Sequence, residues 1–190
     1  MTVAIDLTLL PGPAQKILDP AGPPPLKAMA AKGLVPGLKP GEILAVVVAL
    51  SQGTDTVAET ARQTLEKLPP PLVNGALGAE LQPGVLDVLG PIYAKDAAVS
   101  EKVLNHPAIL PATVAAMAGA ASEGVCELIA TNEERLIAHP EIIEKLYLNR
   151  NARMSTADRI LELAVRHGLE LKIPAFEQAK IAIQGELIAE

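Results

Sequence analysis

One short phrase of sequence occurs twice and limits what this chain can fold into. Residues 104–110 and residues 137–143 both read as apolar residue, any residue, His, Pro, any residue, Ile, apolar residue. The two prolines, Pro107 and Pro140, are 33 residues apart. Self-similarity with a period of about 20 to 50 residues is typical of proteins built from stacked repeats. The phrase therefore predicts a repeat architecture.

Prolines at similar intervals extend this pattern along the chain. Pro70, Pro107, Pro140 and Pro174 follow one another at intervals of 37, 33 and 34 residues, and each precedes a short apolar stretch. Proline is favoured in the first turn of a helix, where no hydrogen bond needs its missing N–H group and its fixed φ suits the helix. We predict that each of these prolines begins a short helix after a sharp corner, as a stack of helical hairpins requires.

The composition favours helices packed directly on one another. Hydrophobic residues make up 49% of the chain, but only one Phe and two Tyr occur, and there is no Trp. We therefore expect a core of Leu, Ile, Val and Ala, which suits close contact between helices better than a large cavity lined by rings. We predict an all-α fold, a superhelical stack of about four to five helical pairs by the usual length of such repeats.

The prolines also divide the chain into two predicted parts. Residues 1–41 contain eight prolines among apolar residues, which indicates a proline-rich N-terminal arm with short helical turns. Residues 42–190 carry the helical patterns and form the predicted repeat array. Two interpretations of the arm remain open, because it could cap the first helix pair or dock a partner.

The repeated phrases resemble those of HEAT-like helical repeats. Residues 105–110 and 138–143, with residues 129–132 between them, are most similar to the leucine-rich-repeat-variant type and to related bacterial helical arrays. The resemblance covers about residues 65–175. It implies a HEAT-like α-solenoid, a curved scaffold that binds another macromolecule, and it brings no active-site residue with it.

Charge, cysteine content and hydropathy narrow the choice of compartment and partner. The net charge of −6 disfavours nucleic acid, because phosphate binding needs a basic surface. The single cysteine fits the reducing cytoplasm. The longest apolar run, residues 43–50, is too short to span a bilayer, and residues 1–10 lack the basic start of a signal peptide. We predict a cytoplasmic protein that does not enter a membrane.

No pattern of residues predicts catalysis, a metal site or a cofactor. His106 and His139 have no further ligands at metal-binding spacing, so we assign them to helix corners, where an imidazole can satisfy free backbone groups. Cys126 lies on an apolar helix face, as a buried and unreactive thiol would. No Gly-rich phosphate loop stands between a strand and a helix. We predict that the chain is not an enzyme.

The candidate partner-binding residues lie in polar corners between helices. Arginine and asparagine can recognise carboxylates or phosphates through paired hydrogen bonds, and polar corners carry function more often than the helices that position them. The alternative is a solvated loop with Arg135 and Arg153 tied to nearby glutamates. The predicted ridge consists of Asn132, Arg135, Asn149, Arg150, Asn151, Arg153 and Arg159.

These observations predict a non-enzymatic scaffold or adaptor that binds a protein partner through a curved helical surface. The alternative is a regulatory helical repeat protein that binds a nucleotide or a nucleic acid. The apolar residues of the last predicted helix, at 181–183 and 187–188, also suggest self-association through that helix.

Overall fold

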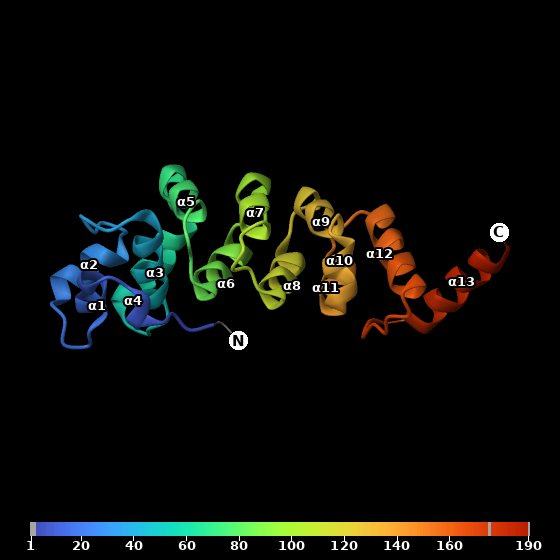
Figure 1. The fold of residues 1–190 in the computed structure, drawn as a ribbon, viewed down its shortest axis with the longest axis horizontal. Helices are drawn as coiled ribbons and strands as arrows, with labels where there is room; N and C mark the ends of the chain where they lie inside the picture. The colour runs from blue at the N-terminus through green and yellow to red at the C-terminus, as the bar shows by residue number, and fades with distance from the viewer. Residues whose placement is uncertain (1–2, 175, 190) are drawn as a thin grey trace. The chain divides into compact units, whose positions relative to one another are not determined.

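The fold is all-helical, as the sequence predicts. The computed structural model describes residues 3–174 and 176–189, with side chains only up to residue 185 within the last helix, and in this part of the chain it contains helices but no strand (Figure 1). None of the described helices is both long and apolar enough to cross a membrane.

The chain divides into two units, each with its own buried core. Unit 1 comprises the described residues up to Tyr93 together with Asn105–Ile109, and unit 2 comprises Ala94–Leu104 and the described residues from Leu110 onward. The helices of unit 1 are η1 (Leu7–Leu9), α1 (Gly12–Leu18), α2 (Pro24–Ala31), α3 (Pro40–Ser51), α4 (Thr56–Glu66), α5 (Pro70–Leu77) and α6 (Pro83–Ile92). Those of unit 2 are α7 (Ala97–Leu104), α8 (Pro111–Ala120), α9 (Glu123–Ala130), α10 (Glu133–Ala138), α11 (Pro140–Leu148), α12 (Met154–Arg166) and α13 (Phe176–Ala189).

The cores of both units are aliphatic, as the near-absence of aromatic residues predicts. In unit 1, α3 is buried on most of its faces, and α1, α2, α4, α5 and α6 all pack against it. In unit 2, α8 packs on α11, and α9 packs on α7 and α12. The proline-rich residues before position 41 therefore lie within unit 1, where their helices cover α3 and α4.

Prolines begin many of these helices, but not all of those that we predicted. Pro70 and Pro140 open α5 and α11 as expected. The prediction for Pro107 is wrong, because α8 begins four residues later at Pro111. Pro174 does not begin its helix either, because it lies in a turn and α13 runs from Phe176. Residues 106–109 form a turn in which the N–H of Ile109 donates to the carbonyl oxygen of His106 at 3.1 Å. The repeated His-Pro phrase thus adopts two different structures.

Several helix ends are tied to side chains that come much later in the sequence. Within unit 1, the Tyr93 hydroxyl donates to the carbonyl oxygen of Leu65 at 2.9 Å, and His106 Nε2 lies 3.0 Å from that of Ala79. In unit 2, Arg135 donates to the carbonyl oxygen of Leu104 at 3.1 Å. Together with the bonds of Asn149 and Asn151 described below, these ties span 27 to 31 residues.

Candidate functional site

The polar corner between α11 and α12 is the centre of the candidate site. Helix α11 ends at Leu148, where Asn149 takes an extended conformation with φ −79° and ψ 118°, and α12 begins at Met154. A turn closes the corner, because the N–H of Ala152 donates to the carbonyl oxygen of Asn149 at 3.0 Å. The corner is short, and this backbone hydrogen bond fixes the course of the chain between the two helices.

The structure places Asn149 below the surface instead of on an exposed ridge. Its Nδ2 donates to the carbonyl oxygens of Ala118 at 2.7 Å and Ala121 at 3.0 Å, at the end of α8. Its Oδ1 accepts the N–H of Asn151 at 2.9 Å. Asn149 as a whole residue is 9% exposed. The Asn149 amide is therefore used to join the corner to α8, and it presents little to a partner.

Asn151 lies at the surface but takes part in the same connection. Its Nδ2 donates to the carbonyl oxygen of Ala121 at 3.1 Å, so this one carbonyl accepts from both asparagines of the corner. Because Ala121 follows the last residue of α8, its oxygen would otherwise lack a partner within the helix.

Asn132 and Arg135 lie outside the corner and are engaged in local structure. Asn132 caps α10, since its Oδ1 accepts the N–H of Arg135 at 3.0 Å. The Arg135 guanidinium donates to the carbonyl oxygen of Leu104, not to a glutamate as the alternative interpretation expected. Neither residue lines the hollow described next.

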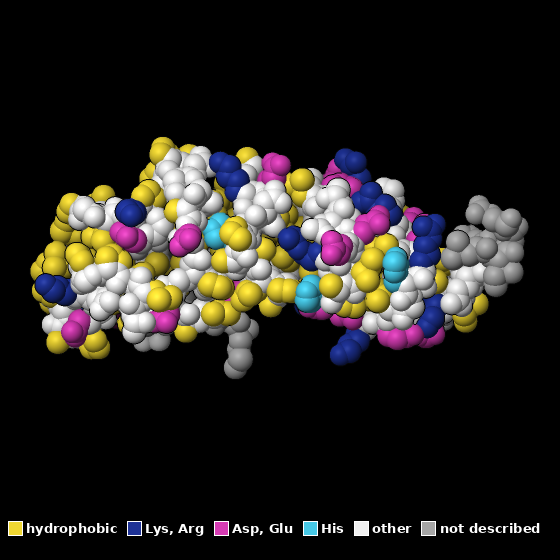
Figure 2. Space-filling model, in the orientation of Figure 1, with side chains coloured by type: hydrophobic (Ala, Val, Ile, Leu, Met, Phe, Trp, Pro, Cys, Tyr) yellow, Lys and Arg dark blue, Asp and Glu magenta, His cyan; other side chains and the backbone are white. Residues whose placement is uncertain are grey.

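Arg150, Asn151 and Arg153 line one open hollow of about 510 Å³ in unit 2. We call it the cationic hollow, and its full lining is Lys95, Ser122, Glu123, Arg150, Asn151, Ala152 and Arg153. The space-filling view shows acidic and basic side chains gathered over the helices of unit 2 (Figure 2). The hollow therefore collects three cationic side chains and one carboxylate in a chain whose net charge is −6.

One of the three cations in the hollow is already paired. Arg153 Nε donates to Glu123 Oε1 at 2.7 Å, and Arg153 Nη2 forms an ion pair with the same oxygen. This hydrogen bond raises the pKa of the Arg153 guanidinium. Among the described residues, the side chains of Lys95 and Arg150 have no hydrogen-bond or ionic partner. The hollow thus keeps two exposed cations for an anionic group from outside.

Arg159 belongs to a neighbouring cluster and does not line the hollow. Its Nη2 lies 3.3 Å from Glu127 Oε2, and the hydroxyl of the buried Thr156 donates to the other oxygen of that carboxylate. The cluster joins α9 to α12 and gives each carboxylate oxygen of Glu127 a partner on α12. Of the seven residues predicted for the ridge, three are therefore brought together in one hollow.

Sequence reasoning missed the contributions of Lys95 and Ser122 to this hollow. Ser122 lies just before α9, Lys95 lies in the turn before α7, and Arg150 lies in the corner between α11 and α12. Successive members of this set are 27 and 28 residues apart. The side-chain ties between helix ends have a similar spacing. Counting back 28 and then 27 residues from Arg150 would therefore have identified Ser122 and Lys95.

Of the remaining candidates, His106 and Cys126 have structural roles, whereas the prediction that the His139 ring binds a backbone group is wrong, because its Nδ1 lies 3.7 Å from Glu141 Oε1. Ala108 N–H donates to His106 Nδ1 at 3.1 Å, so the hydrogen lies on Nε2 and is donated to Ala79, as predicted for an imidazole at a helix corner. Cys126 is buried, and burial raises the pKa of its thiol to about 11. Within the described part of the chain, no group of three or more His, Cys, Asp or Glu side chains is placed to hold a metal ion.

No protein-family model, no curated protein and no solved structure matches this chain. The chemistry of the cationic hollow is therefore argued from its own geometry. Arg and Lys side chains with an amide and a hydroxyl nearby can bind a carboxylate or a phosphate through charge-assisted hydrogen bonds.

Proposed function

We propose that this chain is a non-enzymatic scaffold or adaptor that binds an acidic segment of a protein partner in the cationic hollow. The observation that carries the proposal is the pair of exposed cations without a partner, Lys95 and Arg150, beside the ion pair of Arg153 and Glu123. A partner carboxylate between the two free cations would gain charge-assisted hydrogen bonds without breaking any bond described in the structure.

We further propose a HEAT-like stack of helical hairpins as the architecture of this scaffold. Side-chain ties that repeat over 27 to 31 residues within each unit support this proposal, because stacked repeats place equivalent corners next to one another. In this proposal residues 1–41 act as the proline-rich arm that caps the first helices, and the protein works in the cytoplasm.

A carboxylate suits the cationic hollow better than a polyphosphate or a nucleic acid. The Glu123 carboxylate lies in the lining and would repel a multiply charged phosphate chain. Binding to nucleic acid also needs a broad basic surface, whereas this chain has an excess of acidic residues. A nucleotide or nucleic acid remains the alternative ligand, and the experiment below separates the two.

The test compares partner capture by the wild-type chain, Arg150→Gln and Arg166→Gln. Both variants remove one positive charge from an exposed arginine of unit 2, but Arg166 pairs with Glu162 on α12 and does not line the hollow. The captured partner is then purified, and its Kd is measured by calorimetry at two salt concentrations.

We expect Arg150→Gln to weaken binding at least roughly tenfold, since a hydrogen bond to a charged group contributes about 1.5–3 kcal/mol. Arg166→Gln should bind like the wild type, and added salt should weaken wild-type binding through screening. Equal binding by all three proteins would overturn the assignment of the hollow. A rise in Tm with nucleotide that Arg150→Gln abolishes would favour the alternative function.

A further inference from the structure

Residues 3–7, here called the N-terminal segment, lie across α6 in unit 1 and are bound there by Asp87 of that helix and by Gln82, the residue just before it. The N–H of Val3 donates to Asp87 Oδ2 at 2.9 Å. The N–H of Asp6 donates to Gln82 Oε1 at 2.7 Å, and Gln82 Nε2 donates back to the carbonyl oxygen of Asp6 at 2.9 Å. Helix α6 thus holds the segment at both ends.

These three bonds recognise main chain and not side chains. A side-chain amide offers one donor side and one acceptor side, so Gln82 pairs with the N–H and C=O of one extended residue much as a neighbouring strand would. Asp87 likewise accepts a main-chain N–H. Any extended segment with free N–H and C=O groups at these places could make the same bonds.

Gly84 allows the close approach of the segment to α6. A Cβ atom built at Gly84 would lie 2.3 Å from the carbonyl oxygen of Val3, which no side chain can tolerate, and 3.1 Å from Ile5 Cδ1. Glycine inside a helix costs about 0.5–1 kcal/mol relative to alanine. The absence of a side chain at Gly84 therefore allows the segment to lie this close to α6.

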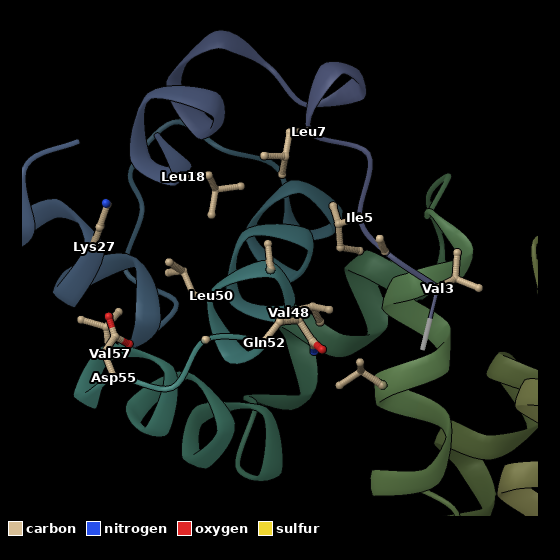
Figure 3. Close-up of a pocket in the computed structure, with 14 residues that line it drawn as sticks. Val3, Ile5, Leu7, Leu18, Lys27, Val48, Leu50, Gln52, Asp55 and Val57 are labelled. Carbon is tan, nitrogen blue, oxygen red and sulfur yellow. The ribbon is translucent and has the colours of Figure 1, made fainter. Parts of the chain in front are cut away.

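The N-terminal segment leaves part of the adjoining groove open. A cavity of about 510 Å³ lies between the segment and residues of α1, α2, α3, α4 and α6 (Figure 3). The apolar Leu18, Val48 and Leu50 line it, together with the polar Lys27, Gln52 and Asp55. The occupant remains partly exposed, with Val3 at 42% and Leu7 at 43%. A segment with larger apolar side chains would bury more surface in the same place.

We propose that α6 and this groove form a docking site for an extended, apolar segment of a partner protein, and that the N-terminal segment occupies it as an intramolecular competitor. The groove supplies apolar contacts from Leu18, Val48 and Leu50, while Gln82 and Asp87 supply main-chain recognition. The site lies in unit 1 and uses none of the residues of the cationic hollow, so it does not rest on the function proposed above.

The test uses the full chain and a fluorescent peptide with the sequence of residues 1–10 as the probe. The double substitution Val3→Pro and Asp6→Pro removes both N–H groups that α6 accepts, while proline keeps these residues extended. A tethered segment competes at an effective concentration in the millimolar range. We therefore expect the peptide to bind the double variant at least tenfold more tightly than the wild type, measured by fluorescence anisotropy.

Two further substitutions in the double variant show where the peptide binds. Gln82→Ala removes both amide contacts and Gly84→Val fills the point of closest approach, so each should abolish binding, whereas Arg150→Gln should leave it unchanged. Circular dichroism checks that each variant remains folded. Equal affinity for the double variant and the wild type, or binding that survives in folded Gly84→Val, would overturn the proposal. A wild-type dimer that these substitutions dissociate, seen by light scattering, would replace the partner with a second copy of the chain.

Discussion

Asn149 shows how a residue that looks functional in sequence can be structural. Its amide bonds to the carbonyl oxygens of Ala118 and Ala121 hold the corner before α12 against the end of α8. The sequence identifies the corner and its polar character, but whether an asparagine points inward depends on what lies behind it. That information belongs to the packing of α8 and α11.

Replacing Asn149 with alanine should destabilise the protein, because a buried carbonyl would lose its partner. We expect a loss of about 1–3 kcal/mol in the free energy of unfolding, measured in urea. Asn151→Ala is the matched control, since Asn151 is exposed and water can replace its bond to Ala121. Its effect should stay within about 0.5 kcal/mol. Similar losses for the two variants would contradict this assignment.

Cys126 should make stability depend on pH in the alkaline range. Burial raises its pKa from 9.0 to about 11. Well below pH 9 the thiol is protonated in both the folded and the unfolded chain, so it has no effect on the pH dependence. Between pH 9 and pH 11 only the unfolded thiol ionises, which favours unfolding.

The wild type should therefore lose about 2 kcal/mol relative to Cys126→Ala as the pH rises from 9 to 11. Measuring the difference between the two proteins cancels the titration of other groups. A difference that stays constant over this range would show that the thiol ionises as easily in the folded chain as in the unfolded one.

At the scale of single helices, several starts follow local chemistry and can be predicted. Pro70 and Pro140 begin helices because their fixed φ suits the first turn. Pro107 fails because Pro111 fits the same rule four residues later, and the His106 ring binds the N–H of Ala108 to hold a turn. Pro107 and Pro111 satisfy this local rule equally well, so only tertiary contacts decide which of them begins the helix.

Gly168 ends α12 with a positive φ of 63°, and this conformation gives an element-scale prediction. A Cβ there meets no atom within 4 Å, so Gly168→Ala should cost only the backbone strain, about 1–2 kcal/mol. Gly124 lies in the first turn of α9 with equal space around it and no positive φ, so Gly124→Ala should be neutral or stabilising. Urea unfolding of both variants tests this contrast, and equal effects would contradict it.

At the scale of the whole molecule, the chain passes between its two units three times. Asn105–Ile109 belong to unit 1 although the residues on either side belong to unit 2. The twofold repetition of a phrase predicts stacked elements but not this interleaving. The cationic hollow could likewise be predicted only in part. Arg150, Asn151 and Arg153 lie together in one corner of the sequence, whereas Lys95 and Ser122 come from earlier corners.

The interleaving predicts how fragments of unit 1 behave. A fragment of residues 1–109 should melt several degrees higher than a fragment of residues 1–93, because only the longer one contains His106, which binds the carbonyl oxygen of Ala79. His106→Ala in the longer fragment should remove most of this gain. Thermal unfolding followed by circular dichroism provides the measurement, and equal midpoints for the two fragments would show that Asn105–Ile109 add nothing to unit 1.

The two partners of each tie between helix ends are synthesised in the same order. In every one of them the backbone carbonyl comes first and the side chain that binds it comes later, as with Ala79 and His106 or Ala118 and Asn149. A ribosome adds about 5–20 residues per second, so each carbonyl waits roughly one to six seconds for its partner to be synthesised. During translation the most recently synthesised helix ends therefore still lack these hydrogen bonds. Each bond forms only after the corner 27 to 31 residues later has been synthesised.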